Sequence, residues 1–332
     1  MTSVSPEMRF DQDVVIVTGG GRGLGRDHAL AFAARGAAVV VNDVDAAAAQ
    51  SVVDEIIGAG GHAIADSHSV VDAAGASAIV STALDAFGDL TILVNNAGVI
   101  DFASLVDIDD AAWRRMIAVT LDGTFHLAKA AWPHFVRQGY GRIVNTTSNA
   151  GFAGNETLVH YGAAKMGVAG LTRALAQEVG NTGITVNAIA PMAITRMNRD
   201  AFFGGTEAQS EDWQSDIREG RVPMGPSSIV SPTVLWLAHE STTINGEIFS
   251  TSSGRVARVA FVMSDGIFDP HQTPETLRDR AAEIRELKTV FEPGCTTDEL
   301  MLIPALFQQN RISDELSESL DEGAAHRHNR LR

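Results

Sequence analysis

The chain of 332 residues is 45% hydrophobic and 20% charged, a composition typical of a globular protein with a sizeable core. Its formal net charge of -16 argues against general binding to nucleic acid or anionic membranes, so we expect a small-molecule substrate. Cys295 is the only cysteine, which excludes an internal disulfide bond and fits a reducing compartment. Neither a signal segment nor an apolar run of membrane-spanning length is present, so we predict a cytoplasmic protein.

Between Val14 and about Ser250, short Val- and Ile-rich runs alternate with longer Ala-rich segments. This alternation is typical of parallel strands connected by helices, and it predicts an α/β fold with a doubly wound, Rossmann-type sheet. The predicted strands are Val14–Thr18, Ala37–Asn42, His62–Ala65, Leu90–Asn96, Arg142–Ser148, Ile184–Ala190 and Gly246–Thr251. Helices are expected in the intervals between them.

A glycine-rich turn follows the first predicted strand, in the segment "VVIVTGGGRGLGRDHALAFAARG". Gly19, Gly23 and Gly25 permit a tight turn and a close approach of the backbone to a pyrophosphate. The start of the following helix supplies free N–H groups and the positive end of a dipole. The turn therefore predicts a dinucleotide site.

Asp43, at the end of the second predicted strand, indicates which dinucleotide binds. A carboxylate there would accept hydrogen bonds from the adenosine ribose and repel a 2'-phosphate, which favours NAD. Arg22 in the glycine turn is a contrary signal, although it is equally well explained as an ordinary solvated side chain. We give Asp43 more weight, because a fixed carboxylate beside a phosphate costs more than a mobile arginine recovers through solvent.

Three polar residues are candidates for catalysis. Lys165 follows Tyr161 by one helical turn, so its ammonium group could lower the tyrosine pKa toward neutral pH. Ser148 ends the predicted strand "RIVNTTS", at the sheet edge where ligands bind, and its hydroxyl could hold a substrate carbonyl. Each feature alone has an ordinary structural explanation, as a helix pair or a strand-end cap. Together with the glycine turn, they predict an oxidoreductase site.

These motifs resemble those of the short-chain dehydrogenase/reductase family over about Val14 to Gly254. The matching segments are "TGGGRGLG", "NNAG", the serine at 148 and "YGAAK", in the order and at the spacing of the family. The resemblance implies that Tyr161 exchanges a proton with the carbinol and that Ser148 orients the carbonyl. It implies that Lys165 binds the nicotinamide ribose and lowers the tyrosine pKa. It also suggests a homodimer or homotetramer.

The same resemblance implies further site residues. Those expected at the cofactor are Leu24, Ser69, Val70, Asn95, Ala97, Gly98, Pro191 and, through its backbone, Ile194. Thr120 stands where the family has a catalytic asparagine, and its backbone carbonyl could still hold a relay water. Met192 replaces a usual glycine and His68 a usual acidic residue, and we assign His68 no chemical role. No metal site is predicted.

A second resemblance concerns the substrate. The segments "VNDVD", Ser231–Phe261 and Thr273–Arg280 resemble the (3R)-hydroxyacyl-CoA dehydrogenase unit of peroxisomal multifunctional enzymes. Without the glycine-rich insertion, hydratase domain or peroxisomal address of those enzymes, a free-standing bacterial-type relative is the better match. The predicted substrate is therefore a 3-hydroxyacyl-CoA, with a fatty or steroid-derived acyl group. Alternatives are a free alcohol, terpene or steroid dehydrogenase, a 3-oxoacyl-carrier-protein reductase, and a catalytically silent NAD-binding regulatory protein.

The expected domain organisation is a NAD-binding domain over residues 1–254, a helical extension over 255–312 and a disordered tail over 313–332. The predicted helices of the extension lie around Pro274–Val290 and Thr297–Gln309. A substrate lid is expected at about 195–226, where the strand and helix pattern stops. Residues that could contact CoA phosphates, or be simply solvated, are Arg196, Arg199, Arg255 and Arg258. Residues that could cover an acyl chain, or only pack the lid, are Phe202, Phe203 and Trp213.

Overall fold

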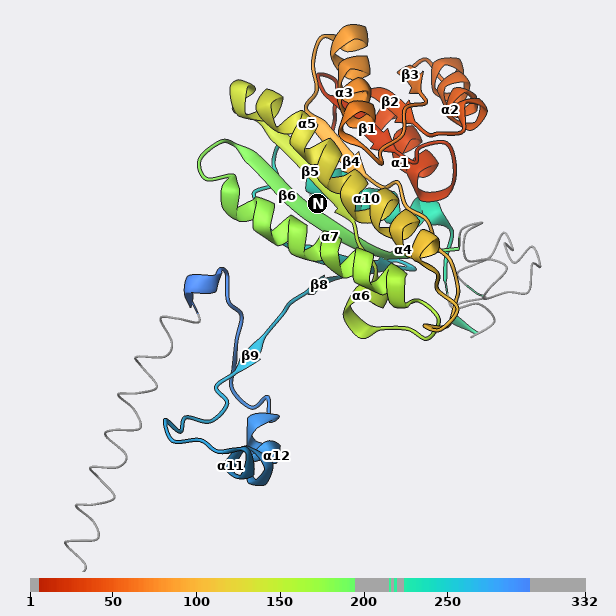
Figure 1. Ribbon diagram of the computed structural model, residues 1–332. Coiled ribbons are helices and arrows are strands. Elements are labelled where there is room, and N and C mark those ends of the chain that lie inside the picture. Colours follow the sequence, from red (N-terminus) through yellow and green to blue (C-terminus); the bar gives the residue numbers. More distant parts are fainter. Residues whose placement is uncertain (1–5, 195–214, 216–217, 220–223, 299–332) are drawn as a thin grey trace, which may run out of the picture. The chain divides into compact units, whose positions relative to one another are not determined.

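The computed structural model describes residues 6–194, 215, 218–219 and 224–298 (Figure 1). The chain divides into two compact units, residues 1–259 and 260–332. Residues 255–259, which we expected in the C-terminal extension, are therefore part of the first unit.

Eight strands of the first unit form one sheet, in the order β3-β2-β1-β4-β5-β6-β7-β8. The strands are β1 (Val14–Thr18), β2 (Ala38–Asn42), β3 (His62–Asp66), β4 (Ile92–Asn95), β5 (Gly141–Thr146), β6 (Ile184–Met192), β7 (Ile248–Ser252) and β8 (Arg255–Val259). Neighbouring strands from β3 to β7 are parallel, and Val15 of β1 lies opposite Val39 of β2 and Ile92 of β4. The predicted doubly wound α/β fold is confirmed.

Helices occupy the intervals between the parallel strands. In the described part of the first unit they are α1 (Gly23–Ala33), α2 (Ala46–Gly58), α3 (Ala73–Phe87), α4 (Asp110–Ile117), the π-helical turn η1 (Ala118–Asp122), α5 (Gly123–Gln138), α6 (Asn149–Ala153), α7 (Val159–Glu178), the 3-10 turn η2 (Ser227–Val230) and α10 (Ser231–Ala238).

The sheet is buried on both faces. Val15 and Val17 of β1 pack in one core with helices α1, α2 and α10, whereas Val14 and Ile16 pack in a second core with α3, α5 and α7. In Figure 1, α5 and α7 lie in front of the sheet. Burial on both faces explains why the strand sequences are continuous Val and Ile runs instead of alternating with polar residues.

Two details differ from the sequence-based expectation. The strand β8 pairs antiparallel with β7 across the tight turn at Ser253 and Gly254, a position with no regular alternation in the sequence to predict it. The helix predicted around Pro274–Val290 is instead two short helices, α11 (Pro274–Asp279) and α12 (Ala281–Ile284), separated by the non-helical backbone of Arg280. Val290 lies in β10 (Val290–Phe291), which pairs with β9 (Met263–Ser264). The other predicted helix lies almost wholly outside the described residues.

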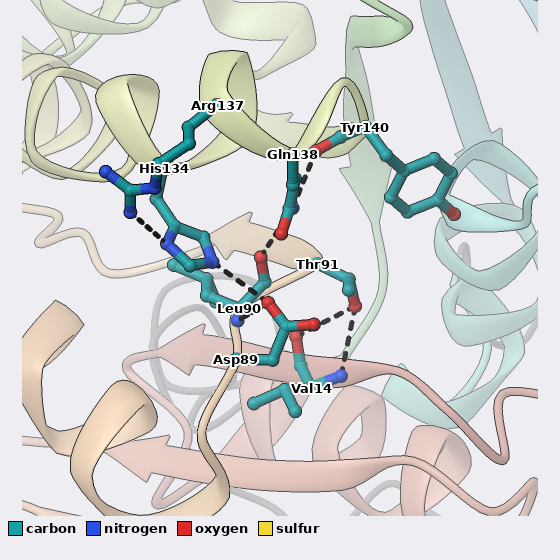
Figure 2. Close-up of polar contacts among 8 residues, drawn as sticks. All are labelled: Val14, Asp89, Leu90, Thr91, His134, Arg137, Gln138 and Tyr140. Carbon is teal, nitrogen blue, oxygen red and sulfur yellow. Dashed lines mark hydrogen bonds and ion pairs between the residues drawn. The ribbon is translucent and has the colours of Figure 1, made fainter.

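Side-chain hydrogen bonds connect the start of β1, the residues before β4 and the end of α5 at the amino-terminal edge of the sheet (Figure 2). The Thr91 hydroxyl accepts the N–H of Val14 at 3.0 Å and donates to its carbonyl at 3.2 Å. Nearby, Asp89 contacts His134 Nε2 at 2.9 Å, and Arg137 donates to His134 Nδ1 at 2.8 Å. Since Nδ1 accepts from Arg137, the ring proton is assigned to Nε2, which donates to Asp89.

We expect Thr91→Val to lower the free energy of unfolding by about 1–3 kcal/mol, because valine keeps the shape but removes the acceptor of a buried N–H. Urea unfolding followed by circular dichroism measures the change. Ser77→Ala is the matched control, since the exposed Ser77 hydroxyl binds the Ala73 carbonyl within its own helix. A loss no larger than that of the control would show that this hydrogen-bond pair contributes little.

Candidate active site and cofactor cavity

A cavity of about 540 Å³ lies at the carboxyl ends of β1, β2, β4, β5 and β6. The strand order reverses at this edge, because β2 and β4 flank β1 on opposite sides. Ligands of doubly wound sheets bind in the crevice at such a position. Six predicted cofactor residues from the turns after β1 and β2 line the cavity, namely Gly19, Arg22, Gly23, Leu24, Gly25 and Asp43.

The other predicted residues that line the cavity come from three further elements. Ala97 and Gly98 follow β4, Tyr161 and Lys165 lie on α7, and Pro191 lies on β6. The structure therefore brings together predicted residues that are up to 172 positions apart, from Gly19 to Pro191.

The glycine turn is packed closely against the start of α1. Gly19 and Gly23 have φ values of +60° and +53°, which glycine adopts without strain. A Cβ atom on Gly25 would lie 2.2 Å from the Gly19 carbonyl oxygen, so no larger residue fits. Helix α1 starts without a side-chain cap, whereas aspartates cap α2 and α3. Its first N–H groups are thus free to bind a pyrophosphate, which agrees with a dinucleotide cofactor.

Asn96 holds this turn from the β4 side, a role that the sequence analysis missed. Its Nδ2 donates to the carbonyls of Thr18 at 2.9 Å and Gly19 at 3.3 Å. The neighbouring Asn95 is buried instead, donates to Asn145 Oδ1 at 2.9 Å, and does not line the cavity. The alternation of side chains along a strand is the signal that could have separated the two asparagines of "NNAG".

Asp43 is held at the cavity by two backbone groups. Its carboxylate accepts the N–H of Gly21 at 3.1 Å and that of Asp45 at 3.0 Å. Arg22 also lines the cavity, but its guanidinium pairs with the Asp45 carboxylate at 2.5 Å. The hydrogen bond from Arg22 lowers the pKa of Asp45, so this carboxylate remains charged.

Ser148 and Tyr161 come together between β5 and α7. Strand β5 ends at Thr146, two residues earlier than expected, and Ser148 becomes the N-cap of α6, accepting the N–H of Ala150 at 3.2 Å. Burial raises the pKa of Tyr161, and a hydrogen bond with Ser148 opposes this rise. The phenol therefore keeps its proton at neutral pH, as a proton donor to a carbonyl must.

Lys165 is buried beneath Tyr161, with Nζ 5.8 Å from the centroid of the tyrosine ring. Nζ donates to the Thr146 carbonyl at 2.7 Å, and Thr147 Oγ1 donates to the Lys165 carbonyl at 2.6 Å. Burial lowers the pKa of Lys165 to about 8. The structure thus places Ser148, Tyr161 and Lys165 close together, while their catalytic roles stay predictions.

Thr120 lies in the π-helical turn η1 and is buried beside the cavity. A Cβ atom on Gly98 would lie 3.8 Å from the Thr120 hydroxyl and 3.5 Å from Lys165 Nζ, so both groups face Gly98. The Thr120 carbonyl accepts the Thr124 hydroxyl at 2.8 Å. The expected relay water would have to share this carbonyl with the Thr124 hydroxyl, and the role of Thr120 stays a prediction.

Five other predicted residues are not part of the cavity lining, namely Ser148, Thr120, Ser69, Val70 and Ile194. Val70 is buried against α5, where its Cγ2 atom lies 2.7 Å from the position of a Cβ on Gly123. Ser69 Oγ accepts the N–H of Val71 at 3.4 Å. The N–H of Ile194 donates to the Gly225 carbonyl at 2.9 Å, so it is engaged within the protein.

Of the residues expected to contact CoA phosphates or cover an acyl chain, the structure describes the two arginines of β8. Arg258 pairs with Glu247 at 3.1 Å, and Arg255 is exposed at the start of β8. The lid residues Arg196, Arg199, Phe202, Phe203 and Trp213 lie outside the described residues. Within the part of the chain that is described, no helix combines the length and the apolar character needed to span a membrane.

Comparison with known proteins assigns the fold and site to a family. The model of the short chain dehydrogenase family matches residues 13–202. The chain therefore belongs to the short-chain dehydrogenase/reductase family and is an oxidoreductase that acts on CH–OH groups. Membership implies a nicotinamide dinucleotide cofactor, which the glycine turn and the uncapped start of α1 fit.

Its relatives include one long and one short protein. Peroxisomal multifunctional enzyme type 2 of Drosophila melanogaster is 40% identical over 312 residues, which are 90% of this chain and 49% of that protein. A short-chain type dehydrogenase/reductase of Mycobacterium tuberculosis is 38% identical over 284 residues, covering 82% of this chain and 94% of that one. The chain spans about half the length of its Drosophila relative. The predicted resemblance to the multifunctional enzymes is confirmed.

Two solved structures are similar to this chain in both fold and sequence. The full-length Drosophila enzyme matches with a TM-score of 0.74 and 32% identity, over 91% of this chain and 50% of that one. A 7α-hydroxysteroid dehydrogenase in complex with NADH and 7-oxo glycochenodeoxycholic acid matches with a TM-score of 0.65 and 31% identity, over 74% of this chain and 94% of that one.

The buried Lys165 predicts a specific pH dependence of stability. Its pKa falls from 10.5 to about 8 on folding, so the unfolded chain binds more protons between these values and stability rises with pH there. From pH 7 to 9.5, the free energy of unfolding should rise by about 2 kcal/mol more in the wild type than in Lys165→Met. Urea unfolding at both pH values measures this difference. Lys129→Met, at an exposed lysine, is the control, and equal pH dependence in all three proteins would contradict the prediction.

Proposed function

We propose that this protein is an NAD-dependent dehydrogenase that interconverts a 3-hydroxyacyl-CoA and its 3-oxo form. The observation that carries the proposal is that Tyr161 and Lys165 line the same cavity as the glycine turn and Asp43. An acid-base pair and a dinucleotide site in one cavity are what hydride transfer to or from a secondary alcohol requires.

The chain's own residues would handle the proton. In the oxidation direction, the substrate hydroxyl gives its proton to the Tyr161 oxygen, and Ser148 holds the substrate oxygen beside it. A bound nicotinamide would accept the hydride from the carbinol carbon. Because burial raises the Tyr161 pKa, the phenolate needs a nearby positive charge, and Lys165 would supply it. In the reverse direction, the protonated phenol is already the required acid.

Asp43 supports NAD as the cofactor in preference to NADP. Its carboxylate is fixed at the cavity by two backbone N–H groups, so it cannot easily turn away from a 2'-phosphate. Arg22, the one contrary signal in the sequence, is paired with Asp45.

The acyl-CoA substrate is supported by the similarity to peroxisomal multifunctional enzymes over most of this chain. The similarity to 7α-hydroxysteroid dehydrogenase favours a free steroid alcohol as a second candidate. A 3-oxoacyl-carrier-protein reductase of Synechocystis is 43% identical, but over only 54% of this chain, and Asp43 disfavours the NADPH that such reductions commonly use. The presence of Ser148, Tyr161 and Lys165 argues against a catalytically silent regulatory protein.

We further propose a cytoplasmic homodimer or homotetramer. A single cysteine suits a reducing compartment. Exposed apolar side chains on neighbouring helices support self-association, including Trp113 on α4, Phe125 on α5 and Met166 on α7.

We expect Tyr161→Phe to reduce turnover by at least about a thousandfold while NADH binding stays close to that of the wild type, because only the acid-base hydroxyl is lost. Steady-state rates and NADH fluorescence titration measure the two quantities. Tyr140→Phe is the matched control, because Tyr140 is the only other tyrosine in the chain and stacks on Arg142 at the opposite edge of the sheet. Retained activity in Tyr161→Phe would remove this tyrosine from the mechanism.

The substrate class is tested by absorbance of the reduced nicotinamide with a short 3-oxoacyl-CoA or the corresponding free acid, each with NADH or NADPH. We expect oxidation of NADH with the CoA ester, and little reaction with the free acid or with NADPH. If the ester gives no reaction although the protein binds NADH, a free alcohol or steroid becomes the favoured substrate.

A further inference from the structure

Asp45 lies outside the cavity lining but contacts two residues that belong to it. One carboxylate oxygen, Oδ1, caps helix α2 by accepting the N–H of Ala48 at 3.1 Å. The other, Oδ2, pairs with Arg22 at 2.5 Å. The backbone N–H of Asp45 donates to Asp43 Oδ1 at 3.0 Å. Asp45 therefore contacts both Asp43 and Arg22, the two residues expected to act in opposite ways on a 2'-phosphate.

The glycine turn and the start of α2 are packed so closely that these contacts are part of the fold. A Cβ atom on Gly21 would lie 2.8 Å from both Asp43 Oδ2 and the Ala48 side chain. Arg22, the next residue, is therefore carried within reach of the α2 cap. The helix cap fixes the Asp45 side chain, so the carboxylate is oriented before Arg22 binds it.

We propose that Asp45 is a positioning residue for cofactor specificity, which holds Arg22 away from the space where a 2'-phosphate would lie. An arginine in the glycine turn would otherwise offer a planar, permanently charged group to that phosphate. Asp45 engages this group and adds a second negative charge behind Asp43. Discrimination against NADP then depends on the Arg22 and Asp45 pair as well as on Asp43. This inference rests on the proposed use of NAD.

The size of the effect follows from the exposure of the pair. The side chains of Arg22 and Asp45 are 43% and 42% exposed, so solvent and salt weaken their attraction. Releasing Arg22 and removing one carboxylate should each change NADPH affinity only a few fold. Together they should change the ratio of NADPH to NADH affinity by about 5- to 20-fold.

The test measures dissociation constants for NADH and NADPH on the full chain by fluorescence or calorimetric titration, without any substrate. Asp45→Asn removes the charge and still caps α2, since asparagine is an equally good N-cap. We expect its NADPH to NADH affinity ratio to rise about 5- to 20-fold. In the double variant Arg22→Ala with Asp45→Asn, the gain should fall to the few-fold part that comes from the lost carboxylate. Asp54→Asn is the matched control, because Asp54 is an exposed carboxylate of the same helix that binds Gln50.

Four outcomes would overturn the inference. An unchanged ratio in Asp45→Asn would show that Arg22 is not restrained by this carboxylate. A gain that keeps its full size in the double variant would show that Arg22 has no part in it. An equal gain in Asp54→Asn would show that the effect comes from net charge alone. A wild-type protein that binds NADPH as tightly as NADH would overturn the NAD assignment itself, which the wild-type titration shows separately from the variants.

Discussion

The close approach of the glycine turn to helix α1 is the constraint on which the cofactor cavity depends. Gly25 lies so near the Gly19 carbonyl that a single added carbon would force the turn apart. Because the turn is that compact, Asn96 can bind two of its carbonyls, and the Gly21 N–H can reach Asp43. One steric requirement thus aligns the uncapped start of α1, the Asp43 carboxylate and the end of β4.

The side of the cavity that holds Tyr161 and Lys165 shows the opposite balance, in which burial of polar groups works against stability. Lys165 is buried with its Nζ bound to a backbone carbonyl, and its pKa falls to about 8. Burial likewise raises the pKa of Tyr161. Both shifts disfavour charge, so the site holds groups whose protonation responds strongly to an added charge or hydrogen bond. Perturbed pairs of this kind are characteristic of acid-base sites.

Much of the fold and of the candidate site could be predicted, because short stretches of sequence indicate the strands and the motifs. Buried parallel strands require Val and Ile runs, and the glycine turn and the Tyr161 to Lys165 spacing each have a stated physical cause. The details that could not be predicted depend on contacts between distant segments. Side-chain alternation predicts only that Asn95 and Asn96 point to opposite faces of the sheet. That Asn96 meets the glycine turn, and that β8 pairs with β7, depends on which strands lie side by side.

The sequence by itself determined the fold class, the approximate positions of β1 to β7 and of the glycine turn, and the candidate residues for the chemistry, since these follow from periodicity and from spacing within one element. Only the tertiary structure decided how Arg22 is used. Its partner, Asp45, is 23 residues away, at the start of another helix, and the two meet because the turns after β1 and β2 pack side by side. Pairings between elements depend on strand order and packing, which no local pattern encodes.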